Sequence, residues 1–197
     1  MSVSFSPALV RYLDAIHPLA PDTWAALRPL FRTVRMAKGS HIAVAGRVGT
    51  SLGLLEAGWV RAYYVSADGT EYSKYLFHAP ALVGDYASFL TGEPVRTPQQ
   101  ALRDCIVHVA DWSRVRVLYD RHRDLERLAR RFAELLYLEN ERREIELVTL
   151  PAAERLRLLI ERHPTIVDDL PKFQIASHLG ITPTQLSRIL KSTRLST

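Results

Sequence analysis

The chain has 197 residues, a net charge of +5 and 47% apolar against 24% charged residues, which is typical of a globular protein and excludes a disordered or fibrous one. It contains no run of about 18 apolar residues and no basic and apolar leader after Met1, so we expect a cytoplasmic protein with no membrane partner. The single cysteine, Cys105, excludes an intramolecular disulfide, a cysteine-based zinc site and an iron–sulfur cluster.

Residues 8–31 are predicted to form short helices, because apolar side chains recur there at steps of three and four residues. These side chains are Leu9, Leu13, Ile16, Trp24, Leu27 and Leu30. Asp22 precedes the second group and is a suitable N-cap for a helix. We therefore expect two short helices ahead of the first strand.

Residues 33–111 change to short apolar runs separated by glycines, a pattern that predicts an antiparallel β-sandwich or β-barrel. The runs span residues 41–45, 52–55, 59–65, 71–77 and 105–109. Asp68-Gly69 stands between two of them and favours a type I′ hairpin, in which both central residues have a positive φ. Cys105 opens the last run, where we expect a small core residue rather than a redox switch.

Residues 121–150 contain neither Gly nor Pro and are rich in Leu, Glu and Arg, which predicts one long helix. Such a helix spans about 45 Å, more than a small barrel can cover, so part of its apolar stripe must face something else. The stripe consists of Leu125, Leu128, Phe132, Leu135, Leu136, Leu138, Ile145 and Leu147. Pro151 suits the first turn of a following helix, so we place a domain boundary near residue 150.

Residues 172–190 carry the most specific motif of the chain, the pattern of a helix-turn-helix. Ala176 is small where the two helices would touch, and Gly180 can adopt the left-handed conformation of the turn. Thr182 is a suitable N-cap for the second helix, and Pro183 suits its first position. The apolar residues that would hold the two helices together are Ile175, Leu179, Ile181, Leu186 and Ile189.

The second helix of this motif would expose polar and cationic side chains of the kind that bind phosphates and base edges. We predict that DNA is contacted by Thr182, Thr184, Gln185, Ser187, Arg188 and Lys191, with Arg194 as a further phosphate contact. Residues 151–197 hold seven basic and four acidic side chains, and no acid follows Asp169. The alternative is an ordinary helical hairpin, whose Ala176 and Gly180 serve packing alone. The purely polar and cationic face favours DNA binding.

A glycine-rich β-roll, a long helix and a helix-turn-helix, in this order, resemble the Crp/Fnr family of bacterial transcription regulators. The resemblance rests on Lys38-Gly39, Leu55-Glu56-Ala57-Gly58-Trp59-Val60-Arg61, Asp68-Gly69 and Val83-Gly84-Asp85, and on Gln174-Ile175-Ala176, Leu179-Gly180-Ile181-Thr182 and Leu186-Ser187-Arg188-Ile189-Leu190. It implies an α+β chain. In it an antiparallel jelly roll (a double-stranded β-helix) with flanking helices precedes a long dimerisation helix and a C-terminal helix-turn-helix domain.

The resemblance divides the chain into three parts. Residues 1–120 would hold the N-terminal helices and a cyclic-nucleotide-binding-like β-roll, residues 121–150 the dimerisation helix, and residues 151–197 the helix-turn-helix domain. It implies a homodimer that forms along residues 121–150, binds double-stranded DNA at a palindromic site and has RNA polymerase as a further partner. Because the sequence ends soon after Lys191, we expect a member similar to the wingless subgroup, without a β-hairpin after the recognition helix.

Many members of this family bind a cyclic nucleotide in the roll, through a Gly-Glu pair and a later Arg-Ser or Arg-Thr pair. The resemblance places these pairs on Gly84-Asp85 and, one residue late, on Arg96-Thr97. A carboxylate can accept from a ribose hydroxyl and an arginine can pair with the cyclic phosphate, so a cyclic nucleotide is the candidate ligand. However, Asp85 is shorter than glutamate, and Pro98 removes a backbone donor. We favour the alternative, in which Asp85 is a turn residue and Arg96 a solvated charge.

The residue content also bears on other sensor types. Iron–sulfur sensing needs several cysteines, and Cys105 stands alone. Haem sensing needs axial ligands, and His41, His78 and His108 lie in the predicted roll, where we expect them to be surface or packed residues. The sequence therefore predicts a β-roll sensor whose ligand is unknown or absent.

The leading hypothesis is a dimeric, sequence-specific DNA-binding regulator in which Arg188 reads a base. The second is a cyclic-nucleotide-binding signalling module with little or no DNA binding. An enzyme is the weakest hypothesis, because the sequence contains no nucleophile elbow, phosphate-binding loop, His-Glu-x-x-His metal motif or dinucleotide fingerprint. We therefore expect a protein without catalytic activity.

Overall fold

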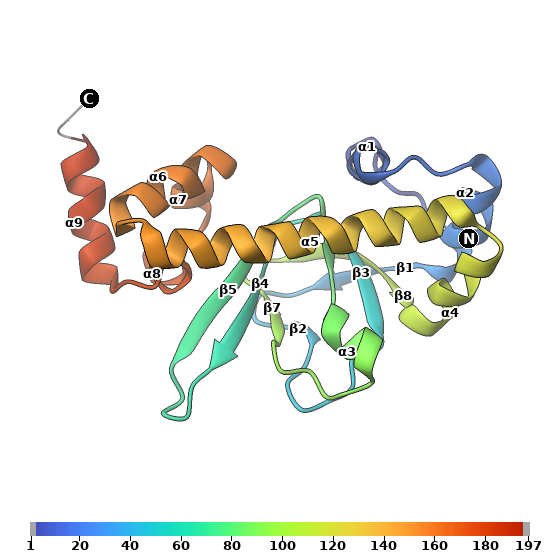
Figure 1. Ribbon diagram of the computed structural model, residues 1–197, viewed down its shortest axis with the longest axis horizontal. Coiled ribbons are helices and arrows are strands. Elements are labelled where there is room, and N and C mark those ends of the chain that lie inside the picture. The colour runs from blue at the N-terminus through green and yellow to red at the C-terminus, as the bar shows by residue number, and fades with distance from the viewer. Residues whose placement is uncertain (1–2, 195–197) are drawn as a thin grey trace. The chain divides into compact units, whose positions relative to one another are not determined.

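The computed structural model describes residues 3–194 (Figure 1). Within them, the contacts between residues group the chain into two compact units. The roll unit contains residues 3–62 and 76–136, and the helical unit contains residues 63–75 and 137–194. The hairpin segment 63–75 therefore groups with the C-terminal helices rather than with the rest of the roll.

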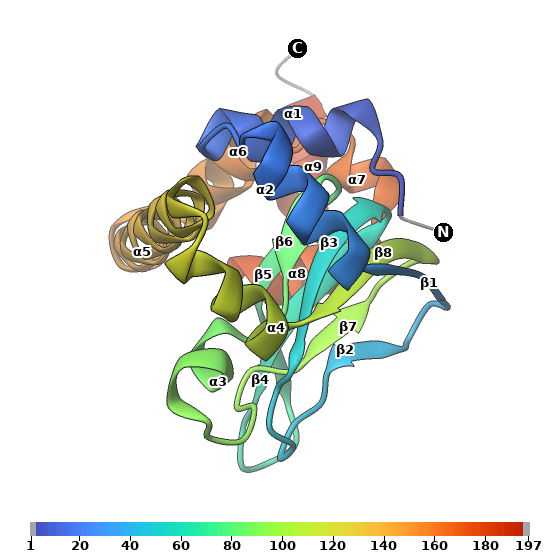
Figure 2. The same ribbon diagram turned by 90° about the vertical axis from the view of Figure 1, so that its right-hand side faces the viewer.

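Two helices open the roll unit, as the sequence predicts, but Asp22 lies in the first turn of the second helix and is not its N-cap, which is Ala20. They are α1 (Pro7–Ile16) and α2 (Pro21–Leu27), followed by the 3-10 helix η1 (Arg28–Leu30). Ser6 caps α1, since its Oγ accepts a hydrogen bond from Leu9 N at 3.3 Å. Leu9, Leu13 and Ile16 are buried in one apolar cluster with residues of the first sheet, on which α1 and α2 pack (Figure 2).

Two four-stranded antiparallel sheets form the roll. The first has the order β1 (Arg32–Met36), β8 (Cys105–Asp111), β3 (Ser51–Ala57) and β6 (Ala81–Val83). The second has the order β2 (His41–Ala43), β7 (Gln99–Ala101), β4 (Trp59–Val65) and β5 (Glu71–His78). Leu55, Val60 and Val107 have no exposed surface and form the centre of the core. The predicted antiparallel roll is confirmed, and the five apolar runs fall in β2, β3, β4, β5 and β8.

The hairpin between β4 and β5 lies where the sequence predicts it, but the type I′ turn is wrong. Gly69 has a φ of +83°, whereas no described residue other than glycine has a positive φ. Gly69 N donates to Ser66 O at 3.0 Å and Ser66 N donates to Thr70 O at 2.9 Å, which makes a longer loop with a single left-handed residue. Asp68 instead stabilises the loop through its side chain, because its Oδ1 accepts from Thr70 N at 3.0 Å.

Helices make up most of the chain after the first sheet is complete. They are α4 (Trp112–Val117), the 3-10 helix η2 (Leu118–Asp120), α5 (Arg123–Thr149), α6 (Ala152–Arg162), α7 (Ile166–Asp169), α8 (Lys172–Leu179) and α9 (Pro183–Arg194); a short helix, α3 (Tyr86–Thr91), lies earlier, between β6 and β7. The long helix predicted over residues 121–150 is α5. It begins two residues later than predicted because Arg121 ends the preceding 3-10 helix η2.

The three predicted parts have boundaries at residues 120 and 150. The boundaries of the two compact units lie elsewhere. The roll unit extends through residue 136, well into α5, because the first turns of that helix bury Leu125 and Leu128 in the apolar cluster of α1 and α2. The three-part division stays a prediction about function. Among the described residues, no helix combines the length and the apolar character needed to cross a membrane.

Candidate functional site

The turn between α8 and α9 has the conformation that the helix-turn-helix motif predicts. Gly180 ends α8 with a φ of +67°, and Ile181 N donates to Ala176 O at 3.0 Å across the turn. A Cβ built on Gly180 would meet only Leu147 Cδ2, at 3.7 Å. The backbone conformation, and not a lack of space, is therefore what favours glycine here.

The two helices of the motif share a small apolar core. Ile175, Ala176 and Leu186 have no exposed surface, and Leu179 is 3% exposed. Ala176 is thus as tightly enclosed as its larger neighbours, so a bigger side chain at this position would push the two helices apart. This packing holds α9 at a fixed angle to α8.

Thr182 and Gln185 bind each other's backbone at the start of α9. Gln185 N donates to Thr182 Oγ1 at 3.2 Å, and Thr182 N donates to Gln185 Oε1 at 2.9 Å. This reciprocal pair is a capping box, which satisfies two backbone donors that the helix leaves open. Two of the residues predicted to contact DNA therefore fix the N-terminus of α9.

The other predicted DNA contacts lie along the outside of α9. Thr184, Arg188 and Lys191 are exposed, and Ser187 is half-buried. The prediction for Arg194 concerns a side chain outside the described ones. Since no acid follows Asp169 in the sequence, this face of α9 carries positive charge without a compensating carboxylate on the same helix.

The hairpin segment 63–75 contacts α8 through polar groups that sequence reasoning missed. Ser73 N donates to Ser177 Oγ at 2.9 Å, and Ser177 Oγ donates to Glu71 O at 3.1 Å. Ser73 Oγ donates to Gln174 Oε1 at 3.4 Å, and both residues are buried. These residues lie about 100 positions apart in the sequence, and no local pattern connects them.

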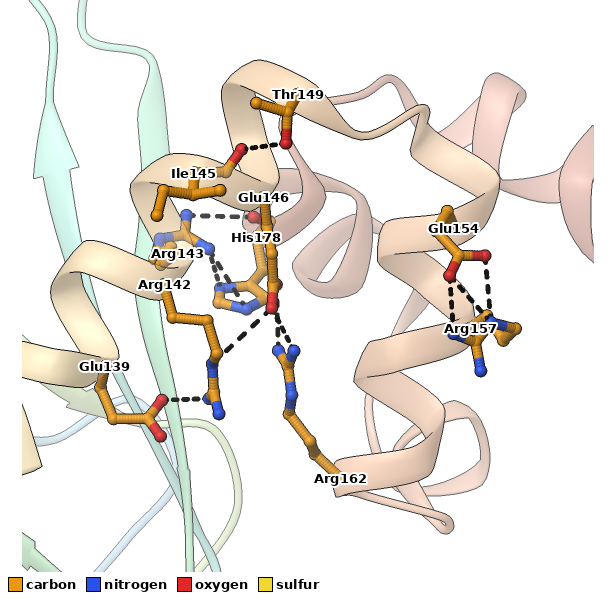
Figure 3. A network of polar contacts seen from close by, with 10 residues as sticks. All are labelled: Glu139, Arg142, Arg143, Ile145, Glu146, Thr149, Glu154, Arg157, Arg162 and His178. Atoms are coloured by element: carbon orange, nitrogen blue, oxygen red, sulfur yellow. Dashed lines mark hydrogen bonds and ion pairs between the residues drawn. The ribbon is translucent and has the colours of Figure 1, made fainter.

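Arg143 of α5 contacts His178 of α8 (Figure 3) and also bonds to Ser73 of the hairpin segment. Its Nη2 donates to Ser73 O and to His178 O, each at 3.1 Å, and its Nη1 lies 3.3 Å from His178 Nδ1. Burial and the charge of Arg143 lower the pKa of His178 to about 3. His178 is therefore neutral near pH 7, and α8 gains no charge from it.

The predicted ligand segment after β6 is built around Gly84, which has a φ of +125°. A Cβ at this position would lie 2.7 Å from Phe89 Cζ and 2.8 Å from Ser51 O, so only glycine fits. Gly84 N donates to Gln99 Oε1 at 2.7 Å, and Gln99 Nε2 donates to Gly84 O at 2.9 Å. Gln99 is 5% exposed. A buried side chain thus already binds the backbone donor that an anionic ligand would use.

The other three predicted ligand residues differ in how far they are exposed to solvent. Asp85 is buried and stands at the N-cap position of α3. The Arg96 side chain is 84% exposed and pairs with Glu93 at 3.1 Å, and Thr97 beside it is half-buried. In this conformation Arg96 binds a neighbouring surface carboxylate, as a solvated loop charge does.

Two further roll residues match their predicted structural roles. His108 is 2% exposed, and its two ring nitrogens contact Thr33 Oγ1 at 3.0 Å and the carboxylate of Glu56. Cys105 is 3% exposed, and burial raises the pKa of its thiol. Within residues 3–194, no three His, Cys, Asp or Glu side chains gather in a way that could hold a metal ion.

The long helix α5 exposes large apolar side chains along its second half. They are Leu135, Tyr137, Leu138, Ile145, Leu147 and Val148, which are between 38% and 81% exposed. Leu135, Leu138 and Ile145 are spaced by three and seven residues, so helical periodicity places them in one stripe. An exposed apolar stripe of this kind is typical of a surface that pairs with another helix.

Comparison with known proteins identifies the first part of the chain. Residues 33–122 match the family model of the cyclic nucleotide-binding domain. This range includes β2 to β8 and α4, together with the predicted ligand residues. No protein with curated annotation matches the sequence.

Solved structures show the fold of nearly the whole chain. FixK2 from Bradyrhizobium japonicum has a TM-score of 0.73 at 18% identity, over 84% of this chain and 85% of that one. A regulator of the Crp/Fnr family from Eubacterium rectale has a TM-score of 0.64 at 16% identity, over 90% and 85%. The catabolite activator protein of Thermus thermophilus has a TM-score of 0.56 at 23% identity, over 92% and 86%.

Proposed function

Because residues 33–122 form a cyclic nucleotide-binding domain and the chain has the fold of the Crp/Fnr regulators, we propose that it is a cytoplasmic, dimeric, sequence-specific DNA-binding transcription regulator. The observation that carries this proposal is the way in which α9 is held and exposed. This helix follows a left-handed glycine turn, is held by a buried apolar core, and exposes Thr184, Arg188 and Lys191 to solvent. In this proposal RNA polymerase is a further partner.

Each side chain of α9 has a distinct role in the proposed complex. Arg188 would read a base, because the planar guanidinium suits the two acceptors on the major-groove edge of guanine. Lys191 would bind a phosphate as a point charge and Arg194 through its guanidinium, while Thr184 and Ser187 would donate to phosphates or base edges. Thr182 and Gln185 have less freedom because the capping box already engages them.

The dimer is proposed to form along α5. Leu135, Leu138 and Ile145 would pair with the same residues of a second chain, since a parallel helix pair needs apolar positions at alternating steps of three and four. Arg142 lies between Leu138 and Ile145 in this register and pairs with Glu139 and Glu146 on its own helix. Two recognition helices related by the dimer axis would then match a palindromic operator.

Selection of bound sites from random double-stranded DNA, with the purified chain, tests the proposal. We expect enrichment of a palindrome, and binding that weakens steeply as the salt concentration rises. Arg188→Ala should abolish the enrichment of one base pair in each half-site. Arg157→Ala is the matched control, because Arg157 is an exposed arginine of α6 that pairs with Glu154 and Glu161. Recovery of no common sequence at moderate salt would overturn the proposal.

A second candidate function is that of a cyclic-nucleotide-binding signalling module, and the match of residues 33–122 favours it. The ligand would have to displace the Gln99 side chain from Gly84 and draw Arg96 away from Glu93. Calorimetry with cyclic AMP and cyclic GMP separates the two candidates. Nucleotide binding without any DNA shift would support the second, and DNA binding that is independent of either nucleotide would support the first.

A further inference from the structure

The hairpin segment 63–75 belongs to the helical unit, although β4 begins and β5 ends in the roll unit. The chain passes between the two units at three places, which are residues 62–63, 75–76 and 136–137. β4 crosses at the first place and β5 at the second, so each strand contributes one end to the helical unit. The compact unit that contains the helix-turn-helix therefore also contains a piece of the second sheet.

β5 is an edge strand of the second sheet, so one row of its backbone groups faces away from β4. In an antiparallel strand such groups belong to every second residue, and side chains of two helices bind them here at Glu71 and Ser73. Ser177 Oγ of α8 accepts from Ser73 N at 2.9 Å and donates to Glu71 O at 3.1 Å. Arg143 Nη2 of α5 donates to Ser73 O at 3.1 Å. α8 and α5 therefore cover this edge of the sheet in one fixed register.

The contacts between the hairpin segment and the helices are shielded from water. Ser73 is 1% exposed and Gln174, which accepts from Ser73 Oγ at 3.4 Å, is 6% exposed. Tyr75, two residues further along β5, donates its hydroxyl hydrogen to Asn140 Oδ1 of α5. Burial raises the pKa of Tyr75 to about 12, so this donor keeps its proton near neutral pH. Buried hydrogen bonds that are satisfied in this way hold their partners in one arrangement.

The position of α9 follows from that of α8, because the buried side chains of Ile175 and Leu186 join the two helices. Arg143 of α5 donates to His178 O of α8 and to Ser73 O of the hairpin segment, so one guanidinium binds both. In a dimer that forms along α5, the distance between the two recognition helices depends on how each α8 and α9 is held to α5. Dimeric helix-turn-helix proteins need a separation of about 34 Å to reach successive major grooves. The hairpin contacts therefore bear on operator binding without touching DNA.

The chain itself supplies both partners of each of these hydrogen bonds, so no bound molecule is needed to form them. We propose that the hairpin segment is a brace that holds α8 and α9 on the second half of α5, so that the protein binds its operator without a small-molecule effector. Because its readout is operator binding, this role rests on the proposed function. Ser73, Ser177 and Arg143 are positioning residues, since they affect DNA only through the placement of α9.

Operator binding by the full chain tests the brace, with the palindrome recovered by site selection as the probe. A preparation whose absorbance spectrum shows no nucleotide should bind this DNA, and cyclic AMP or cyclic GMP at millimolar concentration should not tighten binding. The double variant Ser177→Ala, Arg143→Gln loses the bonds to Glu71 O and to both backbone groups of Ser73, so it should bind about tenfold more weakly. Its preference among operator variants and its salt dependence should match the parent chain, because α9 keeps its own contacts.

Two single variants are the matched controls for the brace. Ser177→Thr keeps the hydroxyl group and should bind the operator as the parent chain does. Thr149→Ala removes a hydroxyl group of α5 that donates to Ile145 O of its own helix, and it should leave operator binding unchanged. A double variant that binds as tightly as the parent chain would overturn the brace. A double variant with a reduced salt dependence would overturn it too, since Arg143 would then be a phosphate contact.

Hydrogen exchange keeps the brace testable if the double variant does not fold. In the parent chain, without DNA or nucleotide, Ser73 N–H should be protected because Ser177 Oγ accepts from it, and in Ser177→Ala it should exchange faster. Exchange of Ser73 N–H in the parent chain as fast as that of an open loop would overturn the brace. Operator binding only in the presence of a cyclic nucleotide would overturn the brace and leave the proposed function standing, whereas no operator binding under either condition would overturn both.

Discussion

The ligand segment after β6 and the helix-turn-helix both contain a glycine with a positive φ, yet they present their polar groups in opposite ways. At Gly84 the backbone N–H and C=O are both bound by the buried side chain of Gln99. On α9, by contrast, Thr184 and Arg188 point their polar groups to solvent. DNA could therefore bind α9 without displacing anything, whereas a nucleotide at Gly84 must first break two internal hydrogen bonds.

The two glycines are also required for different physical reasons. Gly84 has no room for a Cβ, because Phe89 and Ser51 lie within 2.8 Å of where it would be. Gly180 has room, and only its backbone angle favours glycine. A motif glycine can thus mark either close packing or a turn, and the sequence does not distinguish the two.

The largest expected effect comes from adding a methyl group at these two glycines. Gly84→Ala combines a strained φ with two contacts that are too close, and we expect a loss of about 3 kcal/mol of unfolding free energy. Gly180→Ala has the strain alone and should lose about 1 kcal/mol. Chemical denaturation of both variants beside the parent chain measures the difference. Equal losses would show that close packing at Gly84 contributes nothing.

Arg188→Ala gives the next effect, on DNA binding rather than on stability. Removing a bidentate contact with guanine should cost about 1–3 kcal/mol of discrimination at one base pair, because the remaining contacts do not replace it. Competition between the selected operator and its single-base variants measures the cost. Lys191→Ala should instead weaken binding to all sequences alike and reduce its dependence on salt. If Arg188→Ala also weakened all sequences equally, Arg188 would be a phosphate contact.

Gln99→Ala tests whether the Gln99 side chain holds the ligand segment through its hydrogen bonds to Gly84. It leaves the half-buried Gly84 N–H without its acceptor, and we expect a loss of about 2 kcal/mol of unfolding free energy. A cyclic nucleotide should bind more tightly to Gln99→Ala than to the parent chain. An unchanged free energy of unfolding in Gln99→Ala would contradict a stabilising role of the hydrogen bonds between Gln99 and Gly84.

His178 makes the stability of the helical unit depend on pH. Its folded pKa of about 3 lies below the unfolded value near 6.5, because burial and the nearby charges of Arg143, Arg162 and His163 oppose its protonation. As the pH falls below 6.5 the unfolded chain binds this proton first, so stability is lost toward acid pH. Between pH 7 and pH 5.5 the parent chain should lose about 1 kcal/mol more than His178→Gln. The measurement is the free energy of unfolding of both proteins as a function of pH. An equal loss in both would contradict the assignment of this pH dependence to His178.

The local parts of the structure follow from the sequence, and the long-range parts do not. The apolar runs of the roll, the glycine turn at Gly180 and the cap at Thr182 each depend on a few neighbouring residues, and each is present. The partner of Gly84 was not predictable, because Gln99 binds it from a strand 15 positions later and glutamine has no residue type that it must pair with. The same holds for Ser73 and Ser177, which only the fold brings together.

The type I′ turn at Asp68-Gly69 shows why even a local pattern can mislead. The dipeptide permits that turn, but Asp68 Oδ1 binds both Ser66 Oγ and Thr70 N, and these bonds favour the longer loop with a single left-handed residue. Competition between two allowed turns was decided by side-chain hydrogen bonds. The hairpin position could be predicted, and its turn type could not.

The smallest expected effect is at the capping box of α9, and it separates the two roles of Thr182. Thr182→Ala removes the acceptor for Gln185 N and should cost about 1 kcal/mol of unfolding free energy. Thr182→Ser keeps the hydroxyl and should retain most of this energy. If Thr182 serves α9 only as a cap, Thr182→Ser should also bind the selected operator as the parent chain does, whereas Thr182→Ala should weaken binding only through fraying of the first turn. A loss of affinity in Thr182→Ser with unchanged stability would instead identify the threonine methyl group as a direct DNA contact, since that methyl is the one group the substitution removes.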